Sequence, residues 1–183
     1  MSQPGTYVAL LRGVNVGGAR RVAMADLRDL VESLGHKRVR TYIQSGNVVF
    51  TTDGGSAAHD EAALALGIRG RIAERLDLDV DIMVRSQRDL EAALAGVPFP
   101  ETDPKRLLIA FLAEAPTKDA AQAFESIGAP PESAVVVDRV AYLNLPNGVG
   151  RSILAPQLER RLKVRATARN LATVRTLLEM CKG

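Results

Sequence analysis

The sequence predicts an α+β protein built from two ferredoxin-like subdomains of the βαββαβ type, followed by an extra C-terminal helix. Two observations predict this fold class. Short apolar runs typical of strands alternate with segments whose apolar residues recur every three or four positions, as they do in helices. The order of these segments in residues 1–95 is nearly repeated in residues 96–183, which indicates an internal duplication without visible residue-level repetition.

The first predicted subdomain covers residues 1–95, including a connecting helix. Its elements are a strand at residues 7–11, a helix from Met24 to a stop at Gly35, strands at 39–43 and 48–51 around a turn at 44–47, a helix with Leu64, Ile68, Ile72 and Leu76 in one row, a strand at 80–84, and a helix at 87–94 that Ser86 caps with Asp89 in the capping-box position.

The second predicted subdomain covers residues 96–183 and begins with a Pro-rich segment, residues 96–104, which is the candidate boundary. Its elements are a central strand at 107–112, a helix from the cap Thr117 to Ser126, a hairpin with strands at 134–137 and 140–145 turning at Asp138 and Arg139, a helix with Leu154, Leu158 and Leu162 on one face and Pro156 in its first turn, a short strand at 164–166, and a final helix with Leu171, Val174, Leu177 and Cys181.

Composition indicates an ordinary globular chain. Apolar residues make up 46% of the 183 residues and charged residues 25%, and the chain is long enough to bury a core without disulfides. No apolar run approaches membrane-spanning length, the first residues lack a signal-peptide pattern, and a single cysteine, Cys181, cannot form an internal disulfide. We therefore expect a cytoplasmic protein with no membrane association.

The charge is uneven along the chain. Residues 1–40 carry a net charge of +4 and residues 151–183 carry +6, whereas the middle of the chain carries −7. If the two ends meet, they form one basic surface that attracts phosphates, carboxylates or nucleic acid. The alternative is two ordinary solvated faces.

The segment that follows the first strand is the clearest candidate for a ligand site. Three glycines and three arginines lie in residues 12–21, between the strand and the first helix. A glycine-bearing loop that opens a helix exposes backbone N–H groups to an anion. Neither GxxxxGK[ST] nor GxGxxG is present, so no standard nucleotide-binding loop is predicted. A turn with solvated arginines is the alternative interpretation.

Three segments together resemble a known family. They are YVALLRGVNVGG followed by VAMADLR, then VRTYIQSGNVVF, then GVGRSILAPQLERRLKVRATARNLATV. The chain is similar along nearly its whole length to the bacterial family catalogued as domain of unknown function 1697. The family usually has Arg-Asn-Trp-Asn-Thr-Val where this chain has RNLATV, so Leu171 and Ala172 replace the Trp and the second Asn. The resemblance implies two α+β subdomains of related topology and no known activity.

The resemblance also maps the characteristic polar residues and glycines of the family onto this chain. They fall on Arg12, Gly13, Asn15, Gly17, Gly18, Gln44, Ser45, Gly46, Asn47, Arg151, Ser152, Thr167, Arg169, Asn170 and Thr173. From these and the basic loop we predict a ligand-binding set of Arg12, Asn15, Gly17, Gly18, Arg20, Gln44, Ser45, Asn47, Arg151, Ser152, Thr167, Arg169 and Asn170.

The functional hypothesis is a small anionic ligand in a basic cleft formed by the first loop and the C-terminal segment. Arg12, Arg20, Arg151 and Arg169 would converge on it, since arginine favours bidentate contacts with phosphate or carboxylate, with help from the N–H groups of Gly17 and Gly18. Most of these residues also have structural explanations: residues 44–47 form a turn, and Thr167 or Asn170 would cap the last helix.

No signature of catalysis stands out. His36 and His59 are isolated, no Cys/His spacing suggests zinc, and no Gly-x-Ser-x-Gly motif marks a nucleophile, so neither metal nor cofactor is predicted and catalysis stays open. A weak nucleic-acid-binding module is the second hypothesis. Tyr7 and Phe50 fall on predicted strands, but with no Trp, three Tyr and four Phe the chain lacks the aromatic-rich pattern of such a module. A self-associating or protein-interaction scaffold is the third.

Overall fold

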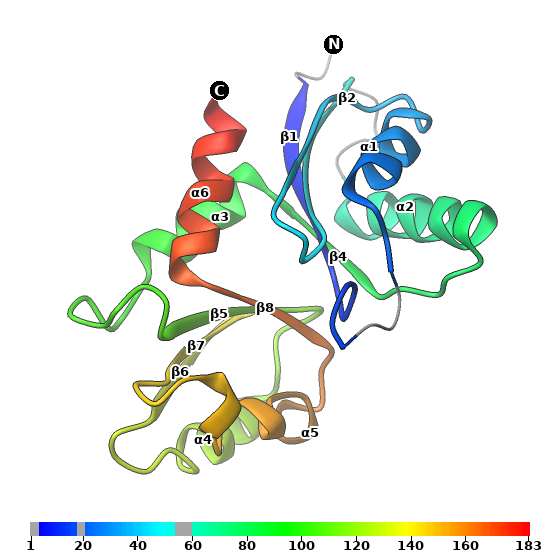
Figure 1. Cartoon of the computed structure of the whole chain (residues 1–183). Helices are drawn as coiled ribbons and strands as arrows, with labels where there is room; N and C mark the ends of the chain where they lie inside the picture. The colour runs from blue at the N-terminus through cyan, green and yellow to red at the C-terminus, as the bar shows by residue number, and fades with distance from the viewer. Residues whose placement is uncertain (1–3, 18–20, 54–59) are drawn as a thin grey trace. The chain divides into compact units, whose positions relative to one another are not determined.

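The computed structural model describes residues 4–17, 21–53 and 60–183 (Figure 1). The chain divides into two compact units. Unit 1 comprises Met1–Glu91 and Leu177–Gly183, and unit 2 comprises Ala92–Thr176. The Pro-rich segment at residues 96–104 lies inside unit 2, and the sequence-based boundary between residues 95 and 96 stays a prediction.

Unit 1 contains a four-stranded antiparallel sheet with the strand order β2-β3-β1-β4. Its elements are β1 (Gly5–Leu11), α1 (Met24–Glu32), β2 (Lys37–Tyr42), β3 (Asn47–Thr52), α2 (Glu61–Leu76), β4 (Ile82–Ser86) and the start of α3 (Gln87–Ala95).

The core of unit 1 lies between this sheet and helices α1 and α2, which run beside each other over one face (Figure 1). Leu64, Ile68 and Ile72 form one buried stripe of α2, as their spacing of four residues predicts. From the sheet, Ala9 and Phe50 are fully buried in the same cluster. Burying this apolar area is the main favourable term in the folding of the unit.

Unit 2 contains a second four-stranded antiparallel sheet, with the order β6-β7-β5-β8. Its elements are β5 (Leu107–Leu112), α4 (Lys118–Glu125), β6 (Ser133–Val137), β7 (Val140–Asn144), two short 3-10 helices at Val149–Arg151 and Ala155–Gln157, α5 (Leu158–Leu162), β8 (Ala166–Asn170) and α6 (Leu171–Lys182), whose last turns belong to unit 1.

The core of unit 2 again fills the space between a sheet and two helices. Phe124 of α4, Leu158 of α5 and Leu143 of β7 belong to one buried cluster. Helices α4 and α5 lie side by side against the sheet (Figure 1). The α+β class, the two sheets and the C-terminal helix are therefore as predicted.

Several local predictions are confirmed. Thr117 caps α4 by accepting a hydrogen bond from the Ala120 N–H at 3.2 Å. Strand β5 occupies residues 107–112 and is an interior strand. The β6–β7 hairpin turns at Asp138, which has a φ of +49°. Caps and turns depend on neighbouring residues only, so the sequence is sufficient to locate them.

Three boundaries were predicted wrongly. Strand β4 begins at Ile82, not at residue 80, because Ile82 pairs with Leu11, the last residue of β1. Strand β8 covers Ala166–Asn170, not residues 164–166, so Thr167 and Arg169 lie in a strand. The helix predicted from Leu154 consists of a 3-10 turn containing Pro156 followed by only the five residues of α5.

Candidate functional site

The first two segments of the family resemblance meet in unit 1. The loop of residues 12–17 follows β1, and the turn of residues 43–46 joins β2 to β3; we call them the paired loops. The Asn15 amide nitrogen donates to the carbonyl of Gln44 at 2.8 Å and to that of Val22 at 2.9 Å. Its oxygen accepts the Val22 N–H at 2.9 Å. One side chain therefore ties the loop to the turn and to the start of the α1 segment.

The backbones of the paired loops also approach each other closely. The Leu11 N–H donates to the Gly46 carbonyl at 2.8 Å. Gly46 has a φ of +72°, and a Cβ added there would lie 2.6 Å from Val14 Cγ2 and 2.7 Å from Leu11 Cβ. Glycine is required at this position both by the backbone conformation and by the contact.

Several residues of the paired loops have a left-handed backbone conformation. Positive φ values occur at Gly13, Asn15, Gly17, Ile43 and Gly46. Ile43 is exceptional because a β-branched residue is strained in this region, and its φ is +48°. Its side chain is nevertheless 50% exposed, so burial of the side chain does not explain the strain.

The predicted site residues of unit 1 take different positions. Arg12, Gly17 and Gln44 are exposed at the paired loops. Asn47 is fully buried, and its amide donates to the Tyr42 carbonyl at 3.0 Å and to Ser45 Oγ at 2.9 Å. Asn47 therefore holds the turn from inside. Gly18 and Arg20 lie outside the residues that the structure describes.

In unit 2, Arg151 and Ser152 lie between β7 and α5, where the first 3-10 helix, Val149–Arg151, ends. Arg151 is exposed, whereas the Ser152 hydroxyl donates to the buried carboxylate of Glu132 at 3.0 Å and accepts the Ala155 N–H at 3.0 Å. Glu132 also accepts the N–H groups of Ile153 and Leu154 at 3.1 and 3.3 Å. A carboxylate of the protein itself therefore accepts hydrogen bonds from the predicted ligand residue Ser152 and from the two backbone N–H groups that follow it.

The remaining predicted residues lie where β8 passes into α6. Arg169 Nη1 donates to Thr167 Oγ1 at 3.1 Å and to the Ala168 carbonyl at 2.9 Å, and burial lowers the pKa of Arg169 to about 10. Asn170 caps α6 by accepting the Thr173 N–H at 2.8 Å. Of the two predicted capping residues, Asn170 therefore has that role.

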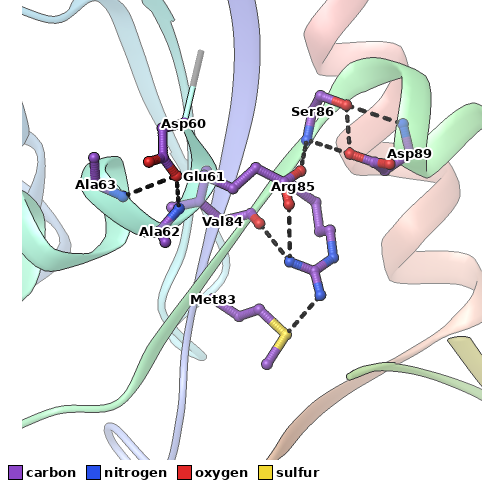
Figure 2. A network of polar contacts seen from close by, with 9 residues as sticks. All are labelled: Asp60, Glu61, Ala62, Ala63, Met83, Val84, Arg85, Ser86 and Asp89. Carbon is purple, nitrogen blue, oxygen red and sulfur yellow. Dashed lines mark hydrogen bonds and ion pairs between the residues drawn. The ribbon is translucent and has the colours of Figure 1, made fainter. Parts of the chain in front are cut away.

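A polar network at the β4–α3 junction was not predicted apart from its capping residues (Figure 2). Glu61, at the first position of α2, lies 3.3 Å from Nη1 of the buried Arg85 and accepts the Ser86 N–H at 3.0 Å. Ser86 and Asp89 form the predicted capping box, with an Oγ to Oδ2 distance of 2.5 Å. In the sequence, Glu61 and Arg85 are simply charged residues next to apolar ones. This pattern is too common to predict that the two side chains meet.

Tyr7 and Phe50 of unit 1 are buried in its core. Tyr7 and Phe50 stack with ring centroids 6.0 Å apart and are 5% and 0% exposed. His36 packs on Phe50 at 4.6 Å, and burial lowers the pKa of His36. Neither Tyr7 nor Phe50 is available to stack on a nucleotide base.

Residues 4–17, 21–53 and 60–183 contain no group of three or more His, Cys, Asp or Glu side chains placed to hold a metal ion. Within the same ranges, no helix has the length and apolar character needed to cross a bilayer.

Comparison with known proteins gives a family and a fold. A family model described as "Protein of unknown function (DUF1697)" matches residues 5–142. A solved structure, that of the conserved bacterial protein SP0830 from Streptococcus pneumoniae, is 24% identical with a TM-score of 0.71 and covers 98% of this chain and 99% of that chain. At this identity the likeness shows the fold alone. No curated protein matches the chain.

Proposed function

The chain belongs to the protein family of unknown function DUF1697, and from that premise we propose that unit 1 binds a small anionic ligand at the paired loops. The observation that carries the proposal is the clamp of Asn15 on Gln44, which fixes two loops whose exposed side chains include Arg12. Arginine binds phosphate or carboxylate through a planar fork of donors, so Arg12 is the proposed anchor.

Backbone strain supports a ligand-binding role for the same loops. A β-branched residue in left-handed backbone costs on the order of 1 kcal/mol or more, and such strain is found preferentially at functional sites. Ile43 is strained and half-exposed, one residue from the clamped carbonyl of Gln44. A rigid scaffold that presents loops is the usual arrangement for a binding site.

Unit 2 contributes a separate candidate, the exposed guanidinium of Arg151. Ser152 and Asn170 have structural contacts that account for them, so the proposal does not use them as ligands. The hypothesis that Arg12, Arg20, Arg151 and Arg169 meet a single ligand in one basic cleft involves both units and stays a prediction.

Two further proposals concern the fold of the units and the location of the protein. We infer that both units are ferredoxin-like and arose by duplication, which the matching strand orders β2-β3-β1-β4 and β6-β7-β5-β8 support. Cytoplasmic location in a bacterium is proposed from the sequence pattern and the family resemblance, because the single cysteine and the composition fit a reducing compartment.

The test is ligand-induced stabilisation with a matched pair of variants. Inorganic phosphate, adenosine monophosphate and glucose 6-phosphate are titrated into the wild type, Arg12→Gln and Arg28→Gln, the last being an exposed arginine on α1. A ligand that binds the folded state raises Tm with its concentration. We expect at least one probe to do so, with affinity reduced by about tenfold in Arg12→Gln and unchanged in Arg28→Gln.

Two other outcomes would replace the proposal. Steeply salt-dependent binding of RNA or DNA oligomers, without a response to the small anions, would favour the nucleic-acid hypothesis. A mass that increases with protein concentration, with neither ligand response, would favour a self-associating scaffold. Equal stabilisation of Arg12→Gln and wild type by the probes would remove Arg12 from the site.

A further inference from the structure

The backbone N–H of Ser86 donates to two carboxylates. Glu61 Oε1 accepts it at 3.0 Å from the start of α2, and Asp89 Oδ2 accepts it at 3.1 Å from the first turn of α3. Both side chains approach Ser86 in Figure 2. The two accepting oxygens therefore cannot lie more than about 6 Å apart. Two ionised carboxylates this close, and partly shielded from water, repel each other strongly.

The charged and titratable groups around this carboxyl pair include Arg85 of β4, Tyr7 of β1 and Asp60, the N-cap of α2. Arg85 of β4 lies against Glu61, with 5% of its side chain exposed compared with 19% for Glu61. Tyr7 of β1 is close enough for the charges of Glu61 and Asp89 to raise the pKa of its hydroxyl, in addition to the larger effect of burial. Asp60, the neighbour of Glu61 on α2, caps that helix by accepting the N–H groups of Ala62 and Ala63.

Glu61 and Asp89 accept the same Ser86 N–H, so two negative charges lie close together when both carboxyls are ionised. A proton held on one carboxyl removes this repulsion and provides an O–H donor to the other. We propose that Glu61 and Asp89 share one proton and so form a pH-sensitive latch that joins α2, β4 and α3 within unit 1.

The environment of Glu61 agrees with this arrangement. Burial and the hydrogen bond with Asp89 raise the pKa of Glu61 above its ordinary value of 4.5, and they outweigh the opposing effects of Arg85 and the Ser86 N–H. A carboxyl whose pKa is higher in the folded state keeps its proton there after the unfolded chain has lost it. The latch therefore stabilises the fold most at acid pH, and its contribution declines as the pH rises above 4.5 through the pKa of the folded state.

Most salt-bridged carboxylates have the opposite dependence, which makes the sign a clear test. Urea unfolding is measured from pH 4.5 upward through neutral pH for the wild type, Glu61→Gln, Asp89→Asn and Glu74→Gln. Glu74 is an exposed acid of α2 and serves as the control. His36 adds its own dependence, because burial lowers its pKa and its contribution therefore grows with pH up to 6.5. The difference between each variant and the wild type cancels that background.

We expect the stability of the wild type to fall relative to Glu61→Gln as the pH rises. The unfolding equilibrium constant should change by up to about tenfold for each pH unit in which only the folded state holds the proton. In Asp89→Asn, which removes the second carboxyl, the decline should be smaller than in the wild type, because only the burial of Glu61 still raises its pKa. Glu74→Gln should parallel the wild type. Wild-type stability that rises with pH relative to Glu61→Gln would overturn the proposal.

A second measurement does not depend on the folding of the variants. NMR titration of ¹³C-labelled carboxyl groups in the folded wild-type protein reports the protonation of the pair directly. We expect one step of the coupled titration above the ordinary range of a glutamate. Two steps at or below the ordinary values would exclude a shared proton.

Discussion

The β4–α3 junction of unit 1 and the β8–α6 junction of unit 2 have similar local structures. In each, the strand passes directly into the helix, the residue before the last of the strand is an arginine, and the last is a polar cap. Arg85 donates to the carbonyl of Val84 at 2.7 Å, and Arg169 donates to that of Ala168 at 2.9 Å.

The two arginines differ in how their charge is accommodated. Arg85 faces the Glu61 carboxylate, whereas Arg169 contacts the Thr167 hydroxyl and the Ala168 carbonyl, and burial lowers the pKa of Arg169 to about 10. Two junctions with the same backbone arrangement can therefore surround an arginine with different charged and polar groups. Removing an arginine should therefore have different consequences in the two units.

The largest expected difference comes from Arg85→Met compared with Arg169→Met. Arg85→Met leaves Glu61 beside Asp89 without the positive charge, and breaking a buried pair in this way costs about 3 kcal/mol or more. Arg169→Met removes a charge that burial disfavours, so its cost should be smaller. Urea unfolding of both variants measures the difference, and equal losses would show that the two junctions are electrostatically equivalent.

The capping residues should give a smaller difference. Ser86→Ala removes a hydroxyl that bonds both the Asp89 N–H and the Asp89 carboxylate, which should cost about 2 kcal/mol. Asn170→Ala removes one bond, to the Thr173 N–H, and should cost about 1 kcal/mol. Denaturant midpoints decide the order; a larger loss in Asn170→Ala would contradict it.

The smallest effect is expected at the hairpin turns of the two sheets. Ile43 and Asp138 have nearly the same φ, +48° and +49°, but aspartate tolerates this region and isoleucine does not. Ile43→Asn should stabilise the protein by about 1 kcal/mol, whereas Asp138→Asn should have little effect. Thermal unfolding tests the pair. A loss of stability in Ile43→Asn would mean that the Ile43 side chain offsets its own strain through packing.

The sequence was a good guide wherever structure depends on near neighbours. The apolar run of β5, the Thr117 cap and the box of Ser86 and Asp89 each follow from a few consecutive residues. Strand β8 was misplaced because its position is set by pairing with β5, and its residues ATARN have little strand character of their own.

The candidate site was predictable only as a set of residues. Asn15 and Gln44 were both identified, but nothing in the sequence indicates that a bond joins them across 29 positions. Glu132 was missed because a glutamate in a proline-rich loop gives no sign that it is buried against three partners. Glu61 and Arg85, 24 positions apart, were missed for the same reason.

The central claim is that the paired loops of unit 1 bind an anion, and an NMR titration tests it most directly. Inorganic phosphate is added to ¹⁵N-labelled protein at constant ionic strength, with chloride as the control salt. We expect saturable shifts that are concentrated at residues 12–17 and 43–46 and that disappear in Arg12→Gln. Saturable shifts centred elsewhere, or identical shifts with phosphate and chloride, would contradict it.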